Sequence, residues 1–297
     1  MDTCTSCYAT DIDQLGIIRQ LVEHGYATID NLLSNPDDLQ CLLQEASAAA
    51  AQTTTSSTQG LGQGQGQDQH KQHTQQKKIE GIEEQKDEKE DGEMLVTTAT
   101  IKHKCILVKT DQPDDIRSDL THDVDPLDTE QLPYIAKASR TLQFVVGGAV
   151  DNFLSQPLYC RERPQFACYA GAGGFYTRHY DNPRLLKGGT DNLRRLTILL
   201  YLNQDWDETQ LGGQLRLHVK TNDALDVTIA PKANRCVLFF ADLIEHEVLP
   251  SYGNRLALTI WLSELNPDPA SGLTKEINSN DQLMRDFFVS CCNRARQ

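Results

Sequence analysis

The sequence predicts an α+β protein whose core is a double-stranded β-helix, or jelly roll, with flanking N-terminal and C-terminal helices. From Gln165 onward, runs rich in β-branched and aromatic residues follow one another at short intervals, with turn-forming residues between them. This pattern is typical of antiparallel sandwiches and jelly rolls, because a parallel sheet would need helical patterns between its strands. Helical patterns instead precede and follow these runs, so we expect helices at the two ends of the core.

The first helix is predicted over residues 10–24, where apolar residues recur at helical spacing. Thr10 or Asp11 is available as its N-cap, and Gly25 can end it. A short strand and a turn follow in YATIDNLL. The apolar face of the helix comprises Leu15, Ile18, Leu21 and Val22.

Three further helices are predicted. One follows the first strand over residues 35–48, and one lies near the end of the chain, around Asn280 to Ser290. The longest covers Asp128 to Asn152, after a strand-like alternation in MLVTTATIKHKCILVKT. Its predicted inward-facing residues are Leu132, Ile135, Ala136, Leu142 and Val146.

Residues 48–93 interrupt the folded pattern. This stretch passes from Ala, Thr and Ser through Gly and Gln to mixed charges, with almost no large apolar residues. It cannot bury enough apolar surface to offset the entropy of ordering, so we predict a disordered low-complexity insertion. The predicted organisation is a flexible tail (1–9), N-terminal helices and a strand of the folded domain (10–47), the insertion, and the rest of that domain (94–297).

The acidic composition argues against several classes of partner. The 297-residue chain has a formal net charge of −14 at pH 7 and a pI near 4.9. Such a chain is poorly suited to bind nucleic acid without sequence preference or to dock on an anionic membrane. No apolar run reaches the ~20 residues of a transmembrane helix, and the N-terminus lacks the pattern of a signal peptide. We therefore expect no nucleic-acid partner, no membrane partner, and a cytoplasmic or nuclear location.

The nine cysteines are scattered along the chain and are expected to be free thiols in a reducing compartment. Cys4 and Cys7 form a CxxC, but no second pair at zinc-finger spacing follows. We therefore favour a plain tail over a metal or redox role for this pair.

The stretch RHYDNP, residues 178–183, carries the first candidate metal ligands. On a strand, His179 and Asp181 would share a face, because alternate residues point the same way. His246 begins a later strand-like run, and Arg255 starts the next one. Two His and one carboxylate form the facial triad of non-haem Fe(II) oxygenases, and an Arg could pair with a dicarboxylic acid in the same pocket. Zinc is the competing metal, although the H-E-x-x-H motif of zinc hydrolases is absent.

Four linked motifs extend this pattern: CYAGAGGFYTRHYDNP, LLYLNQDWD, GGQLRL and FFADLIEHEVLPSYGNRLALTIW. Together they resemble the 2-oxoglutarate- and Fe(II)-dependent prolyl 4-hydroxylases of the oxygen-sensing type, which act on hypoxia-inducible factor (HIF). The resemblance runs from about residue 100 to 264 and, more faintly, through EHGYATIDNLLS. It implies a dioxygenase domain, Fe(II) as cofactor, 2-oxoglutarate as co-substrate, a requirement for ascorbate, and a proline-containing protein as substrate. Separately, we expect a monomeric chain.

The resemblance also implies roles for individual residues. His179, Asp181 and His246 would bind the iron. Arg255 would hold the distal carboxylate of 2-oxoglutarate, with Tyr201 donating a hydrogen bond to it. The other co-substrate residues that it implies are Tyr169, Leu215, Val248, Thr259 and Trp261.

On the substrate side, DIRSD (residues 115–119) resembles the start of the mobile loop that closes over the target peptide in this family. The resemblance implies an ion pair between Asp119 and Arg194, and places Arg117 and Tyr176 on the same side. Gln165 departs from the family pattern, in which an apolar residue lines the pocket. The low-complexity insertion is also foreign to that pattern.

The preferred prediction is a hydroxylase of a HIF-type transcription factor, but the same chemistry could serve another target. A related cytoplasmic branch in protists hydroxylates the adaptor subunit of SCF ubiquitin ligases, and the sequence is equally compatible with that branch. A collagen hydroxylase of the endoplasmic reticulum fits less well, because no signal peptide or retention tail is seen. From a different class, an inactive jelly roll that only binds a partner is the remaining alternative.

Overall fold

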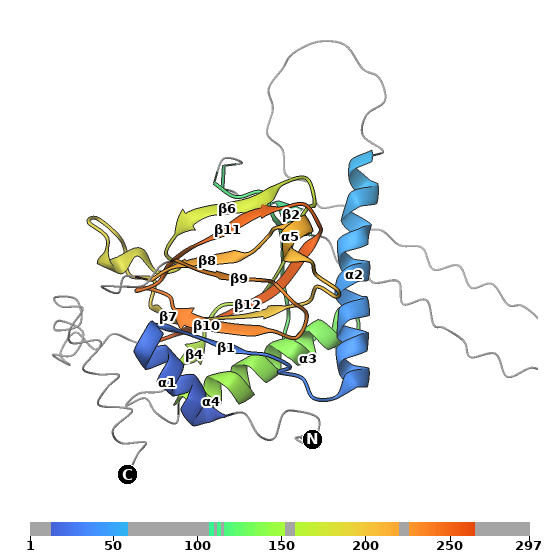
Figure 1. Ribbon diagram of the computed structural model, residues 1–297. Coiled ribbons are helices and arrows are strands. Elements are labelled where there is room, and N and C mark those ends of the chain that lie inside the picture. Colours follow the sequence, from blue (N-terminus) through green and yellow to red (C-terminus); the bar gives the residue numbers. More distant parts are fainter. Residues whose placement is uncertain are drawn as a thin grey trace, which may run out of the picture.

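The computed structural model describes residues 13–58, 107–109, 112–113, 116–151, 158–219 and 226–264. Their strands form two facing antiparallel sheets (Figure 1), so the predicted jelly-roll core is confirmed. The larger sheet has the order β1 (Tyr26–Ile29), β10 (Cys236–Phe240), β7 (Arg194–Tyr201), β12 (Arg255–Ser263), β5 (Gln165–Tyr169), β3 (Leu120–Asp123) and β2 (Val108–Lys109), and β4 (Tyr159–Cys160) also pairs with β12. The smaller sheet has the order β6 (Gly174–His179), β11 (Glu245–Ser251), β8 (Leu215–His218) and β9 (Val227–Ile229).

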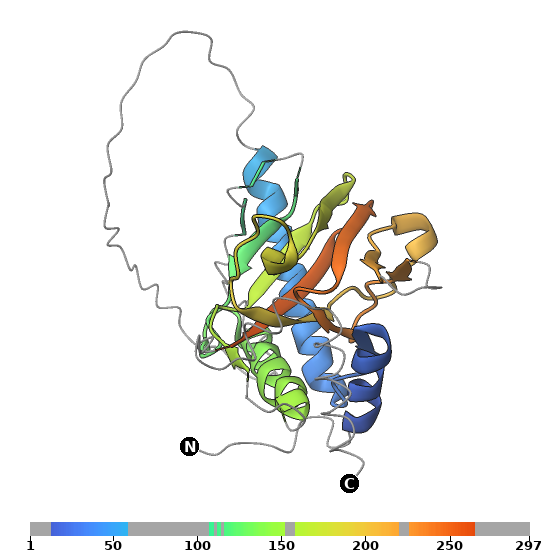
Figure 2. The same ribbon diagram turned by 90° about the vertical axis from the view of Figure 1, so that its left-hand side faces the viewer.

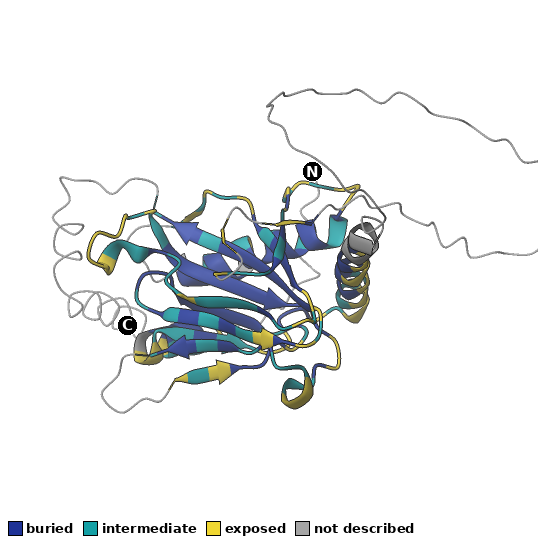
Figure 3. Ribbon diagram, turned by 90° about the horizontal axis from the view of Figure 1, so that it is seen from above, coloured by how far each residue is buried: buried dark blue, intermediate teal, exposed yellow. Residues whose placement is uncertain are grey.

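Helices cover the outer face of the larger sheet (Figures 1 and 2). Helix α1 (Gln14–His24) contacts β1 and β10, whereas α2 (Pro36–Thr58) and α3 (Pro133–Thr141) contact β12. The short helix α5 (Glu208–Leu211) and the 3-10 turn η3 (Pro183–Leu185) lie in loops between strands. Strands β10, β7 and β12 of the larger sheet are almost entirely buried, whereas β11 in the smaller sheet alternates between buried and partly exposed residues (Figure 3).

Helix α1 confirms the predicted helix but corrects both its start and its face. Its N-cap is Asp13, whose carboxylate accepts a hydrogen bond from the Gly16 N–H at 2.8 Å, so Thr10 and Asp11 were the wrong choice. Gly25 ends the helix with a φ of 79°, in the left-handed region that favours glycine. Leu15 was predicted to face inward but is 53% exposed, and its predicted partners Ile18 and Leu21 are buried.

Helix α2 is longer than predicted. The prediction ended it near residue 48, at the start of the low-complexity stretch, but the helix continues to Thr58. Ala49 and Ala50 are buried in its second half. Alanine has the highest helix propensity and packs closely, so an alanine run that looked like low complexity belongs to a packed helix.

The helix predicted over Asp128 to Asn152 begins later and changes its winding. Asp128 accepts hydrogen bonds from the N–H groups of residues 130–132 and holds a turn before α3, which starts at Pro133. A π-helical segment η2 (Leu142–Gly147) and a last turn α4 (Gly148–Asp151) continue α3. All five predicted inward residues are buried: Leu132, Ile135, Ala136, Leu142 and Val146.

Several predictions fall on residues outside the described ranges. These are the tail with Cys4 and Cys7, most of the low-complexity stretch, and the helix near Asn280 to Ser290. Within the described ranges, none of the helices combines the length and apolar character needed to cross a bilayer.

Candidate metal and co-substrate site

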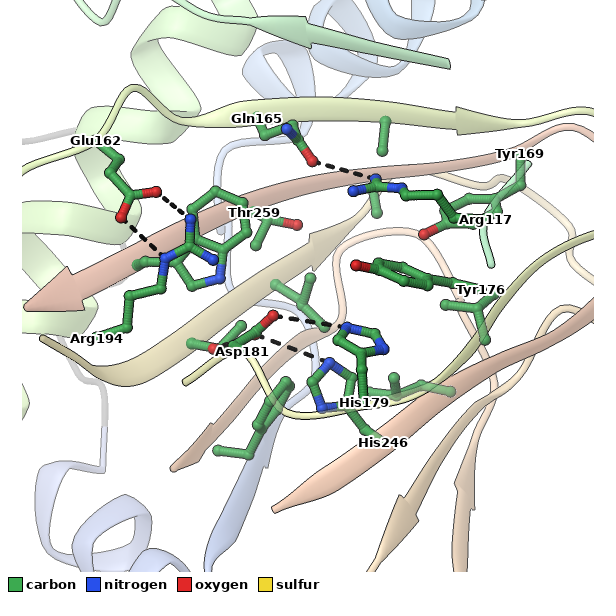
Figure 4. A pocket seen from close by; sticks show the side chains of 18 of the residues that line it. Arg117, Glu162, Gln165, Tyr169, Tyr176, His179, Asp181, Arg194, His246 and Thr259 are labelled. Atoms are coloured by element: carbon green, nitrogen blue, oxygen red, sulfur yellow. Dashed lines mark hydrogen bonds and ion pairs between the residues drawn. The ribbon is translucent and has the colours of Figure 1, made fainter. Parts of the chain in front are cut away.

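A cavity of about 530 Å³ lies between the two sheets and is lined by strands of both. Strands β5, β7 and β12 form one wall, and β6, β8 and β11 form the other. Twelve of the fourteen residues predicted for the site line this cavity, and Figure 4 shows several of them pointing into it. The two that do not line it are Tyr201 and Asp119.

Three candidate metal ligands converge at one end of the cavity. Strands β6 and β11 are neighbours, and their register places His246 directly opposite His179. Asp181 lies just beyond the end of β6, in a loop rather than on the strand as its spacing from His179 had indicated. Its two carboxylate oxygens lie 3.7 Å from His179 Nε2 and 3.8 Å from His246 Nε2 (Figure 4). The ligand atoms of all three residues lie within 4.8 Å of one another, as one shared cation requires.

Hydrogen bonds aim these three side chains at a common point. The Nδ1 atoms of His179 and His246 lie 2.7 and 3.2 Å from the backbone oxygens of Thr177 and Ile244. A proton on Nδ1 makes each of these contacts a hydrogen bond and leaves the Nε2 lone pair available to a metal. Thr197 donates a hydrogen bond of 2.5 Å to Asp181. Each ligand is therefore held by a neighbour in the orientation that metal binding needs.

The ionisation of the cluster also suits a divalent cation. Burial, together with the nearby His179, lowers the pKa of His246 to about 4, so this imidazole is neutral at pH 7. Burial alone would raise the pKa of Asp181, but the two imidazoles and the Thr197 hydroxyl outweigh it, so the pKa lies well below its usual range. Neutral imidazoles and an ionised carboxylate are the forms that bind Fe(II) or Zn(II).

Arg255 forms a buried positive site in the wall of the same cavity. It is 2% exposed, and its Nε donates a hydrogen bond of 2.8 Å to the backbone oxygen of Gly213. The rings of Tyr169 and Tyr201 lie 4.9 Å from its guanidinium carbon. No Asp or Glu of the described ranges forms an ion pair with it, although an unpaired buried charge is strongly unfavourable. Arg255 is therefore set up to bind an anion that enters the cavity.

Tyr201 lies beside Arg255, although it does not line the cavity itself. It is fully buried, and its hydroxyl has no hydrogen-bond partner among the described residues. Burial raises the pKa of Tyr201, only partly offset by Arg255, so the hydroxyl keeps its proton and can donate it in a hydrogen bond. A carboxylate beside Arg255 would satisfy both groups, since unsatisfied buried donors are rare in folded proteins.

The remaining predicted co-substrate residues lie on the cavity walls: Tyr169, Leu215, Val248, Thr259 and Trp261. Sequence reasoning missed Thr197, Leu199 and Ala257, which also line the cavity. A usable signal existed, because alternate residues of a strand share a face. Counting back by twos from Tyr201 along β7 reaches Leu199 and Thr197, and counting forward from Arg255 along β12 reaches Ala257.

The mouth of the cavity corrects one prediction. Asp119 was expected to pair with Arg194, but it pairs with Arg117, whose Nε lies 2.6 Å from it. Arg194 instead donates two hydrogen bonds to Glu162, one of 2.9 Å, and stacks 3.9 Å above the ring of Trp261 (Figure 4). Glu162, which follows β4 closely, therefore takes the place that the resemblance gave to Asp119.

Arg117 links the predicted substrate-side residues to the metal cluster. Its guanidinium carbon lies 4.4 Å from the ring centre of Tyr176, and Gln165 accepts a hydrogen bond of 3.4 Å from its NH2 group. Tyr176 in turn stacks on His179 with ring centres 3.8 Å apart. Gln165, which departs from the family pattern, therefore contacts the mouth of the cavity rather than its floor.

Residues 164–263 match the family model described as the 2OG-Fe(II) oxygenase superfamily. The chain is 34% identical over 151 residues to the hypoxia-inducible factor prolyl hydroxylase of Caenorhabditis elegans, a match that covers 50% of this chain and 20% of that protein. It is 39% identical over 139 residues to Egl nine homolog 1 of Homo sapiens, covering 43% of this chain and 31% of that protein. The matches thus span less than a third of the length of either relative.

One solved structure with a similar fold is a prolyl hydroxylase from Trichoplax adhaerens in complex with a peptide fragment of the hypoxia inducible factor oxygen degradation domain. The TM-score is 0.52 at 23% sequence identity, and the match covers 84% of this chain and 88% of that chain. The similarity supports the jelly-roll fold. At this level of identity, the similarity concerns the fold alone.

Proposed function

We propose, because residues 164–263 match the family model of the 2OG-Fe(II) oxygenase superfamily, that this chain is a protein prolyl 4-hydroxylase dependent on Fe(II) and 2-oxoglutarate. The observation that carries the proposal is the presence, in one cavity, of a two-His, one-carboxylate cluster and a buried Arg255 without an acidic partner among the described residues. The first feature suits the metal, and the second suits a dicarboxylic co-substrate.

His179, Asp181 and His246 would hold the iron through one face of its coordination sphere, which leaves the cavity side open. Fe(II), when bound with 2-oxoglutarate and O2, supplies the oxidant that hydroxylates C4 of a proline and releases succinate and carbon dioxide. The buried surroundings, including the Tyr176 and Phe239 rings against the two imidazoles, keep bulk water away from these atoms. We expect sustained turnover to require ascorbate.

The distal carboxylate of 2-oxoglutarate would bind Arg255 and accept a hydrogen bond from Tyr201. Tyr169 would approach the end of the co-substrate that chelates the iron, as the resemblance implies. Leu215, Val248, Thr259 and Trp261 would shape the channel between these two ends, since all four line the cavity. Because Arg255 offers a binding site for a second carboxylate in the same cavity as the metal ligands, the site favours 2-oxoglutarate over monocarboxylic oxo acids.

The target protein would approach through the mouth, where Tyr176, Arg117 and Arg194 meet the cavity. Asp119 would act there by fixing Arg117. The proposed target is a HIF-type transcription factor in an oxygen-sensing role, because the relative from Caenorhabditis elegans is named a hypoxia-inducible factor prolyl hydroxylase and the Trichoplax enzyme binds a HIF peptide. A monomeric chain in the cytoplasm or nucleus belongs to the same proposal.

The test is mass spectrometry of proline peptides incubated with the full chain, Fe(II), 2-oxoglutarate and ascorbate. One peptide carries a HIF degron and the other an SCF-adaptor site, so a one-oxygen gain on proline identifies both the reaction and the target. The gain must disappear without 2-oxoglutarate and in His179→Ala. Consumption of 2-oxoglutarate without a gain on either peptide would reject both targets, and no consumption at all would favour a binding module.

A further inference from the structure

Two loops lie next to the candidate iron ligands Asp181 and His246, and a buried ion pair joins these loops. Asp181 is followed by the η3 turn, which carries Arg184. His246 is preceded by the turn between β10 and β11, which carries Asp242. Arg184 Nε donates a hydrogen bond of 2.5 Å to Asp242, and a second guanidinium nitrogen contacts the same carboxylate. Arg184 therefore lies close in sequence to Asp181 and contacts the turn that precedes His246. Asp242 lies close in sequence to His246 and contacts the turn that follows Asp181.

Both charges are withdrawn from water. The exposed fractions of the Arg184 and Asp242 side chains are 2% and 0%. Backbone hydrogen bonds run beside the pair: the Asn182 N–H donates to the Ala241 oxygen at 2.9 Å, and the Ala241 N–H donates to the Arg195 oxygen at 3.0 Å. The two loops are therefore joined next to the ligands by both a backbone hydrogen bond and the buried ion pair.

The loop that carries Arg184 is itself anchored. The Asn182 side chain is fully buried and donates hydrogen bonds of 2.9 Å to Asp191 and 2.8 Å to the backbone oxygen of Arg194. Its own side-chain oxygen accepts the Arg184 N–H at 3.2 Å. Arg184 therefore projects from a turn that three side-chain hydrogen bonds of Asn182 hold in place. A change in the position of its guanidinium is expected to shift the backbone next to Asp181.

Stability is a poor explanation for this pair. Burying two charges costs desolvation energy that their attraction often fails to repay, and apolar pairs of similar volume are commonly as stable or more so. Here the second oxygen of Asp242, Oδ1, has no hydrogen-bond partner among the described residues, so the compensation is incomplete. A buried ion pair does restrict orientation, because the guanidinium N–H groups donate to a carboxylate oxygen only in a limited range of geometries.

We propose that Arg184 and Asp242 form a positioning clamp that sets the separation of Asp181 and His246 in the iron site. This inference rests on the proposed metal site and adds positioning residues to it. Neither clamp residue touches the metal, so both act through the ligands. Loss of the clamp is expected to lower metal affinity, because the ligands must then be ordered on binding.

The test compares the full wild-type chain with the double variant Arg184→Met/Asp242→Leu, which replaces the pair by apolar side chains of similar size. Co(II) serves as the probe, because its visible absorption reports on ligand geometry. We expect the apo double variant to unfold within a few degrees of wild type, but to bind Co(II) at least about tenfold more weakly and with an altered spectrum. Arg184→Lys, which keeps the charge, should lie between the two.

The matched control is Asp38→Asn, which breaks the ion pair between Asp38 on α2 and Lys137 on α3, away from the cavity. It should bind Co(II) as wild type does. Unchanged Co(II) affinity and spectrum in the double variant would overturn the clamp. Failure of the double variant to fold would also contradict the proposal, because it would show that the ion pair is needed for folding rather than for positioning the ligands.

Hydrogen–deuterium exchange of the apo chain keeps this test separate from the proposed function. Peptides covering residues 180–186 and 240–246 should exchange faster in the double variant, while the rest of the described sheets is unchanged. Wild-type protein that binds no Co(II) would reject the proposed metal site, whereas the exchange result would still decide whether the pair holds the two loops together. Equal exchange in both proteins would overturn the clamp directly.

Discussion

At the scale of single residues, the site depends on neighbours that hold each functional side chain in place. The metal ligands and Arg255 could be predicted from sequence motifs, because the chain has only eight His and because the motifs occur in a distinctive order. They did not give Thr197, which hydrogen-bonds to Asp181, because a Thr within LTILLYL looks like any other strand residue. The partner of Arg194 was also wrong, since an ion pair depends on which acid lies nearest in space.

Thr197→Val tests the first of these contacts. The substitution keeps the shape of the side chain but removes the hydrogen bond to Asp181, so the carboxylate loses its fixed orientation. We expect metal affinity to fall about 10- to 100-fold, as is typical when a group that orients a metal ligand is lost. Co(II) titration measures the change, and Thr197→Ser, which keeps the hydroxyl, should restore wild-type affinity. Equal affinities for Val and wild type would show that the contact has no such role.

Glu162→Ala tests the ion pair between Glu162 and Arg194. Arg194 would lose the carboxylate that holds it over Trp261, at a cost of up to about 1 kcal/mol for a partly exposed pair. The KM for the target peptide should therefore rise by about two- to fivefold, while the KM for 2-oxoglutarate stays constant. Glu208→Ala, which removes an exposed partner of Lys232 far from the mouth, is the control. If only the KM for 2-oxoglutarate changed, Arg194 would contact the co-substrate rather than the target peptide, and this prediction would be wrong.

At the scale of elements, strand periodicity was easier to predict than helix ends. The inner faces of β7 and β12 follow from alternation, and the buried stripe of the α3 region follows from helical spacing. Helix boundaries depended on side-chain caps that the sequence offered in several places, so Asp13 rather than Asp11 caps α1. The extension of α2 was missed because composition alone does not reveal which alanines pack against a sheet.

Glu45 of α2 predicts a pH dependence of stability. Its carboxylate is 6% exposed and accepts the N–H groups of Tyr134 and Ile135 at the start of α3. Burial raises its pKa to about 7 despite these hydrogen bonds. Between pH 4.5 and 7 the folded chain therefore binds more protons at this site than the unfolded chain, so the free energy of unfolding falls as pH rises, by roughly 3 kcal/mol in total.

Glu45→Gln removes this titration and keeps a hydrogen-bond acceptor. Thermal unfolding between pH 5 and 7.5 should show a steeper loss of stability in wild type than in the variant. Glu23→Gln, an exposed change on α1, should leave the wild-type slope intact. Parallel curves for wild type and Glu45→Gln would mean that Glu45 has an ordinary pKa in the folded chain.

At the scale of the whole molecule, long-range pairing creates the site. His179 and His246 lie far apart in sequence and meet only because β6 pairs with β11. The order of the motifs and their resemblance to a known family made this meeting predictable, whereas composition and periodicity alone gave only a jelly roll. The clamp between Arg184 and Asp242 could not be predicted, because both residues lie in loops whose proximity depends on the finished fold.

The predicted domain organisation yields a test at the same scale. Residues 62–90 contain few apolar side chains, so we predict that replacing them with a short Gly/Ser linker leaves Tm and turnover at wild-type values. Shortening α2 by removing residues 48–58 is the contrasting change, and it should lower Tm because Ala49 and Ala50 are buried. A large loss of Tm in the linker variant would show that the insertion belongs to the folded domain.

The most direct test of the central claim is an anaerobic titration of the full chain with Fe(II) and 2-oxoglutarate, followed by the visible charge-transfer absorption that a 2-oxo acid gives when it chelates Fe(II). The wild-type chain should develop this band, and Asp181→Ala should not. Arg255→Met should need at least about tenfold more 2-oxoglutarate, because a buried charge pair is lost. No band in the wild-type chain, or equal titrations for wild type and Arg255→Met, would contradict the account.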